Sequence, residues 1–263
     1  MIKFFRKIRQ RLLTENKFSK YLLYAIGEIV LVMIGILLAL QVNNWNENRI
    51  AKTTVNRYLV SLVEDLKEDQ TLLEQIQNIH SFRVHSLIYL RRQSGDPSFS
   101  FGPQQMKVVP FEPNSDWDGP IPTTYNLPFI EEAFSSAGRY LPMTVSSSSI
   151  NELKNTGMFS NIQNLSLKKD IDQYYRNMEW VFFDEIHNES ITKWNNSLLD
   201  SGIYYLQIAE LPDPLDLITK NPERAAYLKN IIAEANYRSK AASNYYNKID
   251  SLIIEIEQEV IQR

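Results

Sequence analysis

The chain of 263 residues contains no cysteine. This absence excludes a disulfide framework, a cysteine-based zinc site and a thiol nucleophile. Only three histidines are present. His80 and His85 would lie about 140° apart on a helix, so they cannot share one metal ion without distortion, and His187 is remote in sequence. We therefore expect no metal site built on histidine.

The short motifs of catalysis and cofactor binding are also missing. The eight glycines occur singly, which leaves no glycine-rich loop to cradle a phosphate, and no H-E-x-x-H, G-x-S-x-G, Walker or Rossmann pattern occurs. The serine run at residues 146–149 has no histidine or lysine in the same short segment to activate a nucleophile, so we interpret it as a helix start with spare hydroxyls. The sequence predicts that the protein is not an enzyme, with no catalytic residue and no cofactor.

The net charge of −3 conceals an uneven distribution along the chain. Residues 1–20 hold seven basic groups and one acid, whereas the remainder is acidic. The seven are Lys3, Arg6, Lys7, Arg9, Arg11, Lys17 and Lys20. A basic end favours an anionic membrane leaflet, and an acidic remainder argues against a nucleic-acid partner. Residues 1–20 are predicted to form a cytoplasmic basic amphipathic segment; a basic flank without a specific partner is the alternative.

Residues 21–42 form an apolar run in which Glu28 and Gln41 are the only strongly polar side chains. As a helix, a run of this length extends about 33 Å, enough to cross a hydrocarbon core of roughly 30 Å. A cleaved signal peptide has a shorter apolar region and a small-residue cleavage site, and this stretch has neither. The run predicts a single transmembrane helix in contact with membrane lipid.

Aromatic residues mark both ends of the predicted span. Tyr21 and Tyr24 at one end and Trp45 at the other lie where amphipathic rings settle at membrane interfaces. The basic groups before the span outnumber those just after it, so the positive-inside rule predicts a cytoplasmic N-terminus. We expect an inner-membrane protein whose residues 43–263 are periplasmic.

One face of the predicted span combines a carboxyl group with small residues. At about 100° per residue, Glu28, Gly35 and Ala39 fall within about 40° of one another. Small residues let a second helix approach closely, and a carboxyl group inside the membrane usually faces protein. The stripe predicts association with a partner membrane protein or with a second copy of the chain. Alternatively, Glu28 is protonated or extends towards the cytoplasmic headgroups, and Gly35 is incidental.

No glycine or proline occurs between Gly35 and Gly95, so the membrane helix is predicted to continue without a break. Its charged residues lie mostly off the apolar stripe and are interpreted as a solvated face. They are Glu64, Asp65, Glu68, Asp69, Glu74, Arg83, Arg91 and Arg92. Residues 95–142 hold eight of the eleven prolines. Because this segment also carries many aromatic side chains, we expect it to fold onto the end of a helical bundle as a cap, with a short helix after Pro128.

Local signals predict two helices after the cap. A short one is expected at residues 149–157, where Ser149 and Glu152 match a capping box. A long one is expected at residues 166–202, with Ser166 as its N-terminal cap.

The last helix is expected to begin at Asn221, as the cap, with Pro222 at its first position, and to reach the C-terminus. Its apolar residues follow a seven-residue repeat, which suits a bundle or a coiled coil. One row is Leu228, Ala235, Ala242, Ile249 and Ile256, and the other is Ile232, Tyr246, Ile253 and Val260.

Asn114, Asp116 and Asp118, followed by Gly119, put oxygen ligands at the first, third and fifth positions of an EF-hand-like loop. The twelfth position is Tyr125 instead of a bidentate glutamate. A calcium site and an Asp-Gly turn in a loop are the two interpretations.

Two stretches resemble a known family. Residues 1–49 contain a basic segment, Tyr-Ala-Ile-Gly-Glu, Ile-Gly-Ile and Asn-Asn-Trp-Asn in that order. This stretch resembles the start of a large, uncharacterised single-pass membrane protein family of Bacteroidota. Residues 150–175 are similar to the same family's later Leu-Lys-x-x-Gly and Tyr-Tyr block. The resemblance implies a membrane protein with a mostly helical outer region, and it implies no activity, ligand or catalytic residue.

The predicted fold is mainly α: a single N-terminal transmembrane helix that continues into an antiparallel periplasmic helical bundle with a Pro-rich loop cap. The first functional hypothesis is a membrane-anchored, non-enzymatic interaction or scaffold protein. The alternative is a periplasmic ligand-sensing subunit that acts through a partner membrane protein. A deep pocket lined by buried polar groups would favour the sensor, and a continuous exposed apolar patch would favour the interaction protein.

Overall fold

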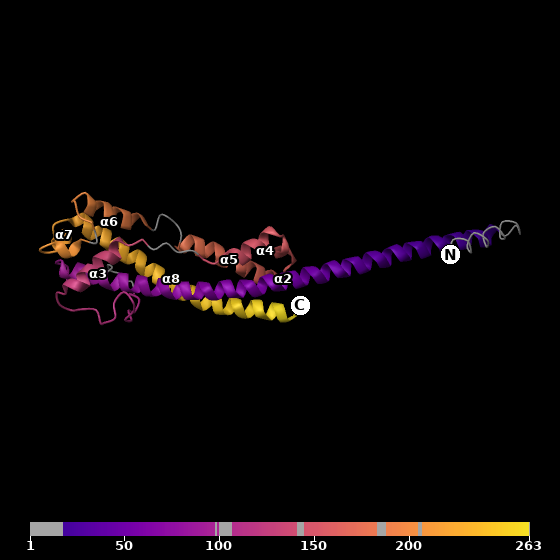
Figure 1. The fold of residues 1–263 in the computed structure, drawn as a ribbon, viewed down its shortest axis with the longest axis horizontal. Coiled ribbons are helices and arrows are strands. Elements are labelled where there is room, and N and C mark those ends of the chain that lie inside the picture. Colours follow the sequence, from indigo (N-terminus) through magenta and orange to yellow (C-terminus); the bar gives the residue numbers. More distant parts are fainter. Residues whose placement is uncertain are drawn as a thin grey trace. The chain divides into compact units, whose positions relative to one another are not determined.

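The structure is a computed structural model that describes residues 18–97, 99, 107–140, 145–182, 188–204 and 207–262. Over these residues every regular element is a helix and none is a strand (Figure 1). The elements are α2 (Phe18–Gln93), α3 (Leu127–Gly138), α4 (Ser148–Asn155), η1 (Met158–Asn161), α5 (Leu165–Phe182), α6 (Glu189–Leu199), η3 (Ile208–Glu210), α7 (Asp216–Thr219) and α8 (Pro222–Gln262). The predicted mainly α class is confirmed.

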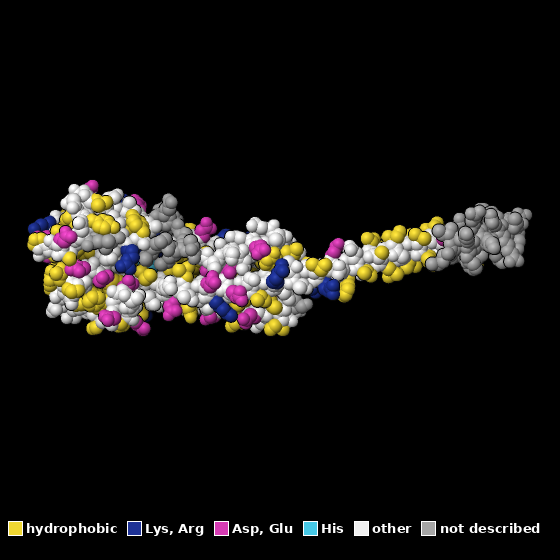
Figure 2. Space-filling view, viewed as in Figure 1, with side chains coloured by type: hydrophobic (Ala, Val, Ile, Leu, Met, Phe, Trp, Pro, Cys, Tyr) yellow, Lys and Arg dark blue, Asp and Glu magenta, His cyan; other side chains and the backbone are white. Residues whose placement is uncertain are grey.

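The chain forms two compact units, Met1–Val55 and Asn56–Arg263. In the first unit, the large apolar side chains of α2 between residues 22 and 42 are all exposed. The most apolar part of this helix has a mean hydropathy of 2.5 with no residue buried, and Figure 2 shows hydrophobic side chains along its surface. Among the described residues this is the one helix that could cross a membrane by length and composition. Residues 1–17, most of the predicted basic segment, lie outside the described residues.

Helix α2 continues to Gln93, as its lack of glycine and proline predicts. It ends before Gly95, whose φ of 101° lies in the left-handed region that glycine adopts without steric cost. In the second unit α2 lies beside α8, and three hydrogen bonds join the two helices. They pair Asn56 with Val260, Gln70 with Asp250 and Gln77 with Ser239. Because the numbers rise along α2 as they fall along α8, the two helices run in opposite directions.

Helix α8 begins as predicted. The side-chain oxygen of Asn221 accepts hydrogen bonds from the backbone N–H groups of Glu223 and Arg224, and Pro222 is the first helical residue. The first apolar row of the repeat is wholly buried, because it faces the other helices of the unit. The second row is less regular, since Tyr246 is exposed.

Within the stretch predicted as one helix at residues 166–202, the structure describes α5, which ends at Phe182, and α6, which starts at Glu189; residues 183–187 between them lie outside the described residues. Its predicted cap is wrong. The backbone N–H of Leu167 donates to the side chain of Asn164 at 3.1 Å, whereas the hydroxyl of Ser166 donates to Asp170 at 3.3 Å. Asparagine and serine are both good caps, and Asn164 lies at the position that reaches the free N–H groups.

The predicted capping box of α4 is wrong for a different reason. The backbone N–H of Ser149 donates to a carboxylate oxygen of Asp65 on α2 at 3.0 Å, and Glu152 accepts from the hydroxyl of Tyr58 at 3.3 Å. A carboxylate from another helix therefore satisfies the start of α4 in place of a local side chain.

The described part of the proline-rich segment contacts both α2 and α8. Val109 is held from two sides, because its N–H donates to Asn236 at 2.9 Å and its carbonyl oxygen lies 2.7 Å from the His85 ring. Pro110 accepts from Ser81 at 2.6 Å. Helix α3 follows, capped by Asn126, and it buries aromatic and aliphatic side chains in a hydrophobic core cluster of the second unit.

These contacts bury the end of α2 on nearly every side, and from residue 81 to residue 90 only His85 and Ile88 are not buried. The predicted solvated face of α2 is therefore partly wrong. Asp69 is 1% exposed and Arg83 is 2% exposed, and Asp65 is also buried. The remaining acids of that face, among them Glu64 and Glu68, are exposed as predicted.

Candidate functional site

The predicted association face lies within a single helix, since α2 includes Glu28, Gly35 and Ala39. Gly35 and Ala39 are exposed and Glu28 is half-buried. A Cβ atom added at Gly35 would meet nothing within 4 Å. Within the first unit this face is open to the close approach of another helix, which is the geometry that a small-residue stripe favours.

Of the predicted interfacial anchors, Tyr24 is 58% exposed and Trp45 is 64% exposed, while the side chain of Tyr21 lies outside the described residues. The guanidinium of Arg49 lies 5.6 Å from the centre of the Trp45 ring, a cation–π distance. Trp45 thus contacts a cationic side chain, a contact that suits a residue at the polar boundary of a membrane.

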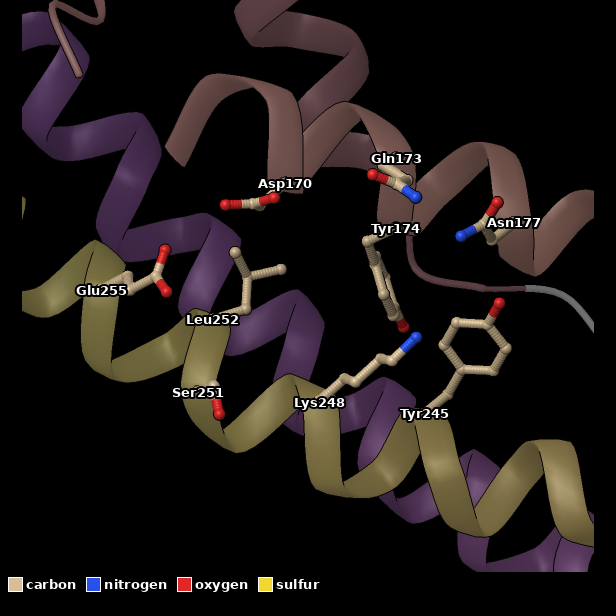
Figure 3. Close-up of a pocket in the computed structure, with 9 residues that line it drawn as sticks. All are labelled: Asp170, Gln173, Tyr174, Asn177, Tyr245, Lys248, Ser251, Leu252 and Glu255. Atoms are coloured by element: carbon tan, nitrogen blue, oxygen red, sulfur yellow. The ribbon is translucent and has the colours of Figure 1, made fainter. Parts of the chain in front are cut away.

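A second candidate site is a groove between α5 and α8 in the second unit (Figure 3). Its volume is about 230 Å³. Most of its lining residues are polar, with two tyrosines and one leucine among charged, amide and hydroxyl side chains, although the surface that they present to the groove is more apolar than polar. The lining residues are Asp170, Gln173, Tyr174, Asn177, Tyr245, Lys248, Ser251, Leu252 and Glu255. A groove of this size and composition fits a small polar ligand or a single side chain of a partner protein.

This groove was not predicted from the sequence. Each wall carries a signal, because residues 170, 173, 174 and 177 follow one face of α5 and residues 245, 248, 252 and 255 follow one face of α8. Neither stripe is apolar, so neither resembles a packing face when read alone. Only the pairing of the two helices turns the stripes into a groove.

Tyr174 connects the groove to the interior of the second unit. Its hydroxyl donates to a carboxylate oxygen of Asp69 at 2.8 Å, and the backbone N–H of Ser146 donates to the other oxygen at 2.8 Å. Burial is the largest influence on Asp69 and raises its pKa to about 6, although both hydrogen bonds act in the opposite direction. Burial and the nearby Asp69 carboxylate raise the pKa of the Tyr174 hydroxyl far above its usual range.

The serine run before α4 is bonded to α2 more closely than predicted. The hydroxyl of Ser146 donates to Glu68 at 2.7 Å, so it is not a spare hydroxyl at the surface. Its backbone N–H bonds Asp69 and that of Ser149 bonds Asp65. The serine run therefore forms hydrogen bonds with Asp65, Glu68 and Asp69, the acids that were predicted to be solvated.

Buried cationic groups form a third feature. Arg83 donates to the backbone oxygen of Arg139 at 2.7 Å, and burial, followed by the charge of Arg238, lowers the pKa of Arg83 to about 9. Burial also lowers the pKa of His80 well below its usual range, so this ring is neutral at pH 7. His80 and His85 have different surroundings, as the helical spacing predicts, and His187 lies outside the described residues.

The EF-hand-like segment is organised as a turn. The side-chain oxygen of Asn114 accepts from the backbone N–H of Asp116 at 2.9 Å, and Asp116 pairs with Arg139 at 3.0 Å. Two of the three predicted ligands, Asn114 and Asp116, therefore have partners within the chain, which favours the turn over a calcium site. Across the described residues no three histidine, aspartate or glutamate side chains are grouped so that they could hold a metal ion.

Residues 28–96 match the model of a family described as "Family of unknown function (DUF6090)". No curated protein and no solved structure matches the chain. The matched residues begin at Glu28 and include all of α2 from there to Gln93, so the similarity covers the predicted association face and the part of α2 that carries Asp65 and Asp69.

Proposed function

We propose that the protein is a non-enzymatic, membrane-anchored interaction protein that docks on a partner membrane protein or on a second copy through the face of Glu28, Gly35 and Ala39. The observation that carries this proposal is the exposed apolar surface of α2 between residues 22 and 42, none of which is covered within its unit. An exposed apolar surface of this length is stable in lipid and unstable in water.

The proposed topology has residues 1–20 in the cytoplasm, residues 21–42 across the inner membrane as a single span, and residues 43–263 in the periplasm. The excess of basic groups before the span supports this direction. The resemblance of residues 1–49 to single-pass proteins of Bacteroidota supports the same arrangement.

The periplasmic part would be an antiparallel helical bundle capped by residues 95–142. The opposite directions of α2 and α8 support the bundle. The bonds from Ser81, His85 and Asn236 to residues 109 and 110 support the cap, because they attach the described part of this segment to both helices.

Two modest free-energy contributions would favour association at the proposed face. A hydrogen bond between helices in lipid contributes on the order of 1 kcal/mol, and close backbone packing at small residues adds dispersion energy. Gly35→Leu removes the close approach, whereas Glu28→Gln retains a hydrogen-bonding group. We expect Gly35→Leu to weaken association at least as much as Glu28→Gln.

An in-membrane proximity assay of the full chain, against itself and against partners captured from native membranes, tests this proposal. Gly27→Leu is the matched control, because Gly27 also has open space around it but lies about 80° from Gly35 on the helix. Loss of proximity with Gly35→Leu and not with Gly27→Leu supports the face. Unchanged proximity with Gly35→Leu in both settings would leave the span as an anchor only and refute docking through this face.

A second candidate function, sensing of a small polar ligand, is favoured by the groove between α5 and α8. In this proposal the signal passes through a partner membrane protein. Thermal-shift measurements with zwitterionic amino acids and neutral monosaccharides test it. The groove-filling variant Ser251→Trp should abolish any stabilisation that arises at this site.

A further inference from the structure

Asp69 joins three parts of the second unit that are distant in sequence. It lies on α2 and is 1% exposed. Its carboxylate accepts from the backbone N–H of Ser146, just before α4, and from the hydroxyl of Tyr174 on α5, both at 2.8 Å. One buried carboxyl group therefore bonds two of the chain segments that pack on this part of α2.

The groups facing Asp69 are acidic or phenolic. Asp65 and Glu68 on α2 repel its negative charge. From α5, the hydroxyl of Tyr175 donates to the backbone oxygen of Ser146 at 3.2 Å, beside the Asp69 contact.

Helix α8 contributes Tyr245 and Lys248, which line the same groove as Tyr174 (Figure 3). The ammonium of Lys248 lies 5.0 Å from the centre of the Tyr245 ring. Within the described part of the chain, no lysine, arginine or histidine forms an ion pair with Asp69. An ionised Asp69 thus has neutral hydrogen-bond donors, two like charges nearby and little water.

We propose that Asp69 is a proton-dependent latch: when its carboxyl group takes up a proton, Ser146 and α5 are held more firmly on α2. This inference does not depend on the membrane anchor. Protonation removes both the cost of burying the charge and the repulsion from Asp65 and Glu68, while a carboxylic acid still accepts hydrogen bonds.

The sign and size of the effect follow from proton linkage. Burial raises the pKa of Asp69 to about 6 in the closed form, and an open form exposed to water has the ordinary value of about 3.9. Because the closed form binds the proton more tightly, the stabilisation is complete below the lower pKa and is lost as the pH rises through about 6. Between pH 7.5 and pH 5 the opening equilibrium should fall about tenfold.

Amide hydrogen exchange of the full chain in lipid nanodiscs, followed by mass spectrometry, measures this opening. After correction for the intrinsic pH dependence of exchange, residues 145–155 and 165–175 should open about tenfold less at pH 5 than at pH 7.5. In Asp69→Asn this difference should disappear. An equal pH dependence in the wild type and Asp69→Asn, or its absence from the wild type, would overturn the latch.

A pair of tyrosine variants provides a second test that does not require replacing Asp69. Tyr174→Phe removes a donor that favours the charged carboxylate, so the midpoint of the transition should move above pH 6. Tyr175→Phe is the matched control, because its hydroxyl donates to a backbone oxygen and not to Asp69. If the pH midpoint is the same in Tyr174→Phe and Tyr175→Phe, Asp69 is not the group that titrates.

Discussion

Asn236→Ala should release the proline-rich segment from α8. Asn236 is fully buried, and its amide makes two hydrogen bonds to the same extended stretch. The side-chain oxygen accepts from the N–H of Val109 at 2.9 Å, and the side-chain nitrogen donates to the carbonyl oxygen of Lys107 at 3.3 Å. Among the described residues of α8, no other side chain makes two hydrogen bonds to the backbone of this segment.

The expected loss of stability depends on which hydrogen-bonding groups lose their partner. The N–H of Val109 has no second acceptor and is buried, so leaving it unpaired costs about 1 to 3 kcal/mol. The carbonyl oxygen of Lys107 keeps its hydrogen bond from Lys240. Losing its bond from Asn236 therefore costs only about 0.5 kcal/mol, the lower end of the usual net contribution of a hydrogen bond. We expect the free energy of unfolding to fall by about 1.5 to 3.5 kcal/mol.

Urea unfolding of the full chain in mild detergent, followed by helical circular dichroism, measures this loss. Hydrogen exchange at residues 107–111 reports release of the segment itself. Asn244→Ala is the matched control, since Asn244 is an exposed asparagine on the same helix, and it should change the stability by less than about 0.5 kcal/mol. A loss for Asn236→Ala no larger than for the control, with exchange at residues 107–111 unchanged, would refute the reasoning.

Four further outcomes are expected. A reporter enzyme that is active only in the periplasm should work when fused to the C-terminus and fail at the N-terminus, and the reverse result would overturn the proposed orientation. Trp194→Ala should cost about 3 to 5 kcal/mol in urea unfolding, because this fully buried ring lies against Phe134 at 5.6 Å; a loss below about 1 kcal/mol would contradict its burial. Asn221→Ala should cost about 1 kcal/mol by removing the cap of α8, whereas an unchanged stability would mean that the cap contributes nothing. Millimolar calcium should leave the unfolding temperature unchanged, because Asn114 and Asp116 already have partners; stabilisation lost in Asp116→Asn would reveal a calcium site.

The features that the sequence predicted correctly depend on residues close together in the chain. Asn221 and Pro222 start α8 because a cap and its helix are neighbours. The absence of glycine and proline predicted that α2 runs on without a break. That Gly35 and Ala39 share one side of α2 follows from helix geometry alone, and the docking of another helix there stays a prediction.

The features that the sequence missed depend on contacts between distant segments. Asp69 meets Tyr174 across 105 residues, and Asp65 replaces the local cap of α4 across 84 residues. No property of either acid distinguishes it in sequence from an exposed neighbour such as Glu68. The groove between α5 and α8 was hidden for the same reason.

The sequence alone therefore determined the helical class, the long apolar helix and the cap of α8, because each arises from local spacing and side-chain chemistry. The tertiary structure decided which charged groups are buried, where α4 begins and where two polar helix faces meet. The burial of a charged group is set by the segments that cover it, and their positions depend on the packing of the whole unit.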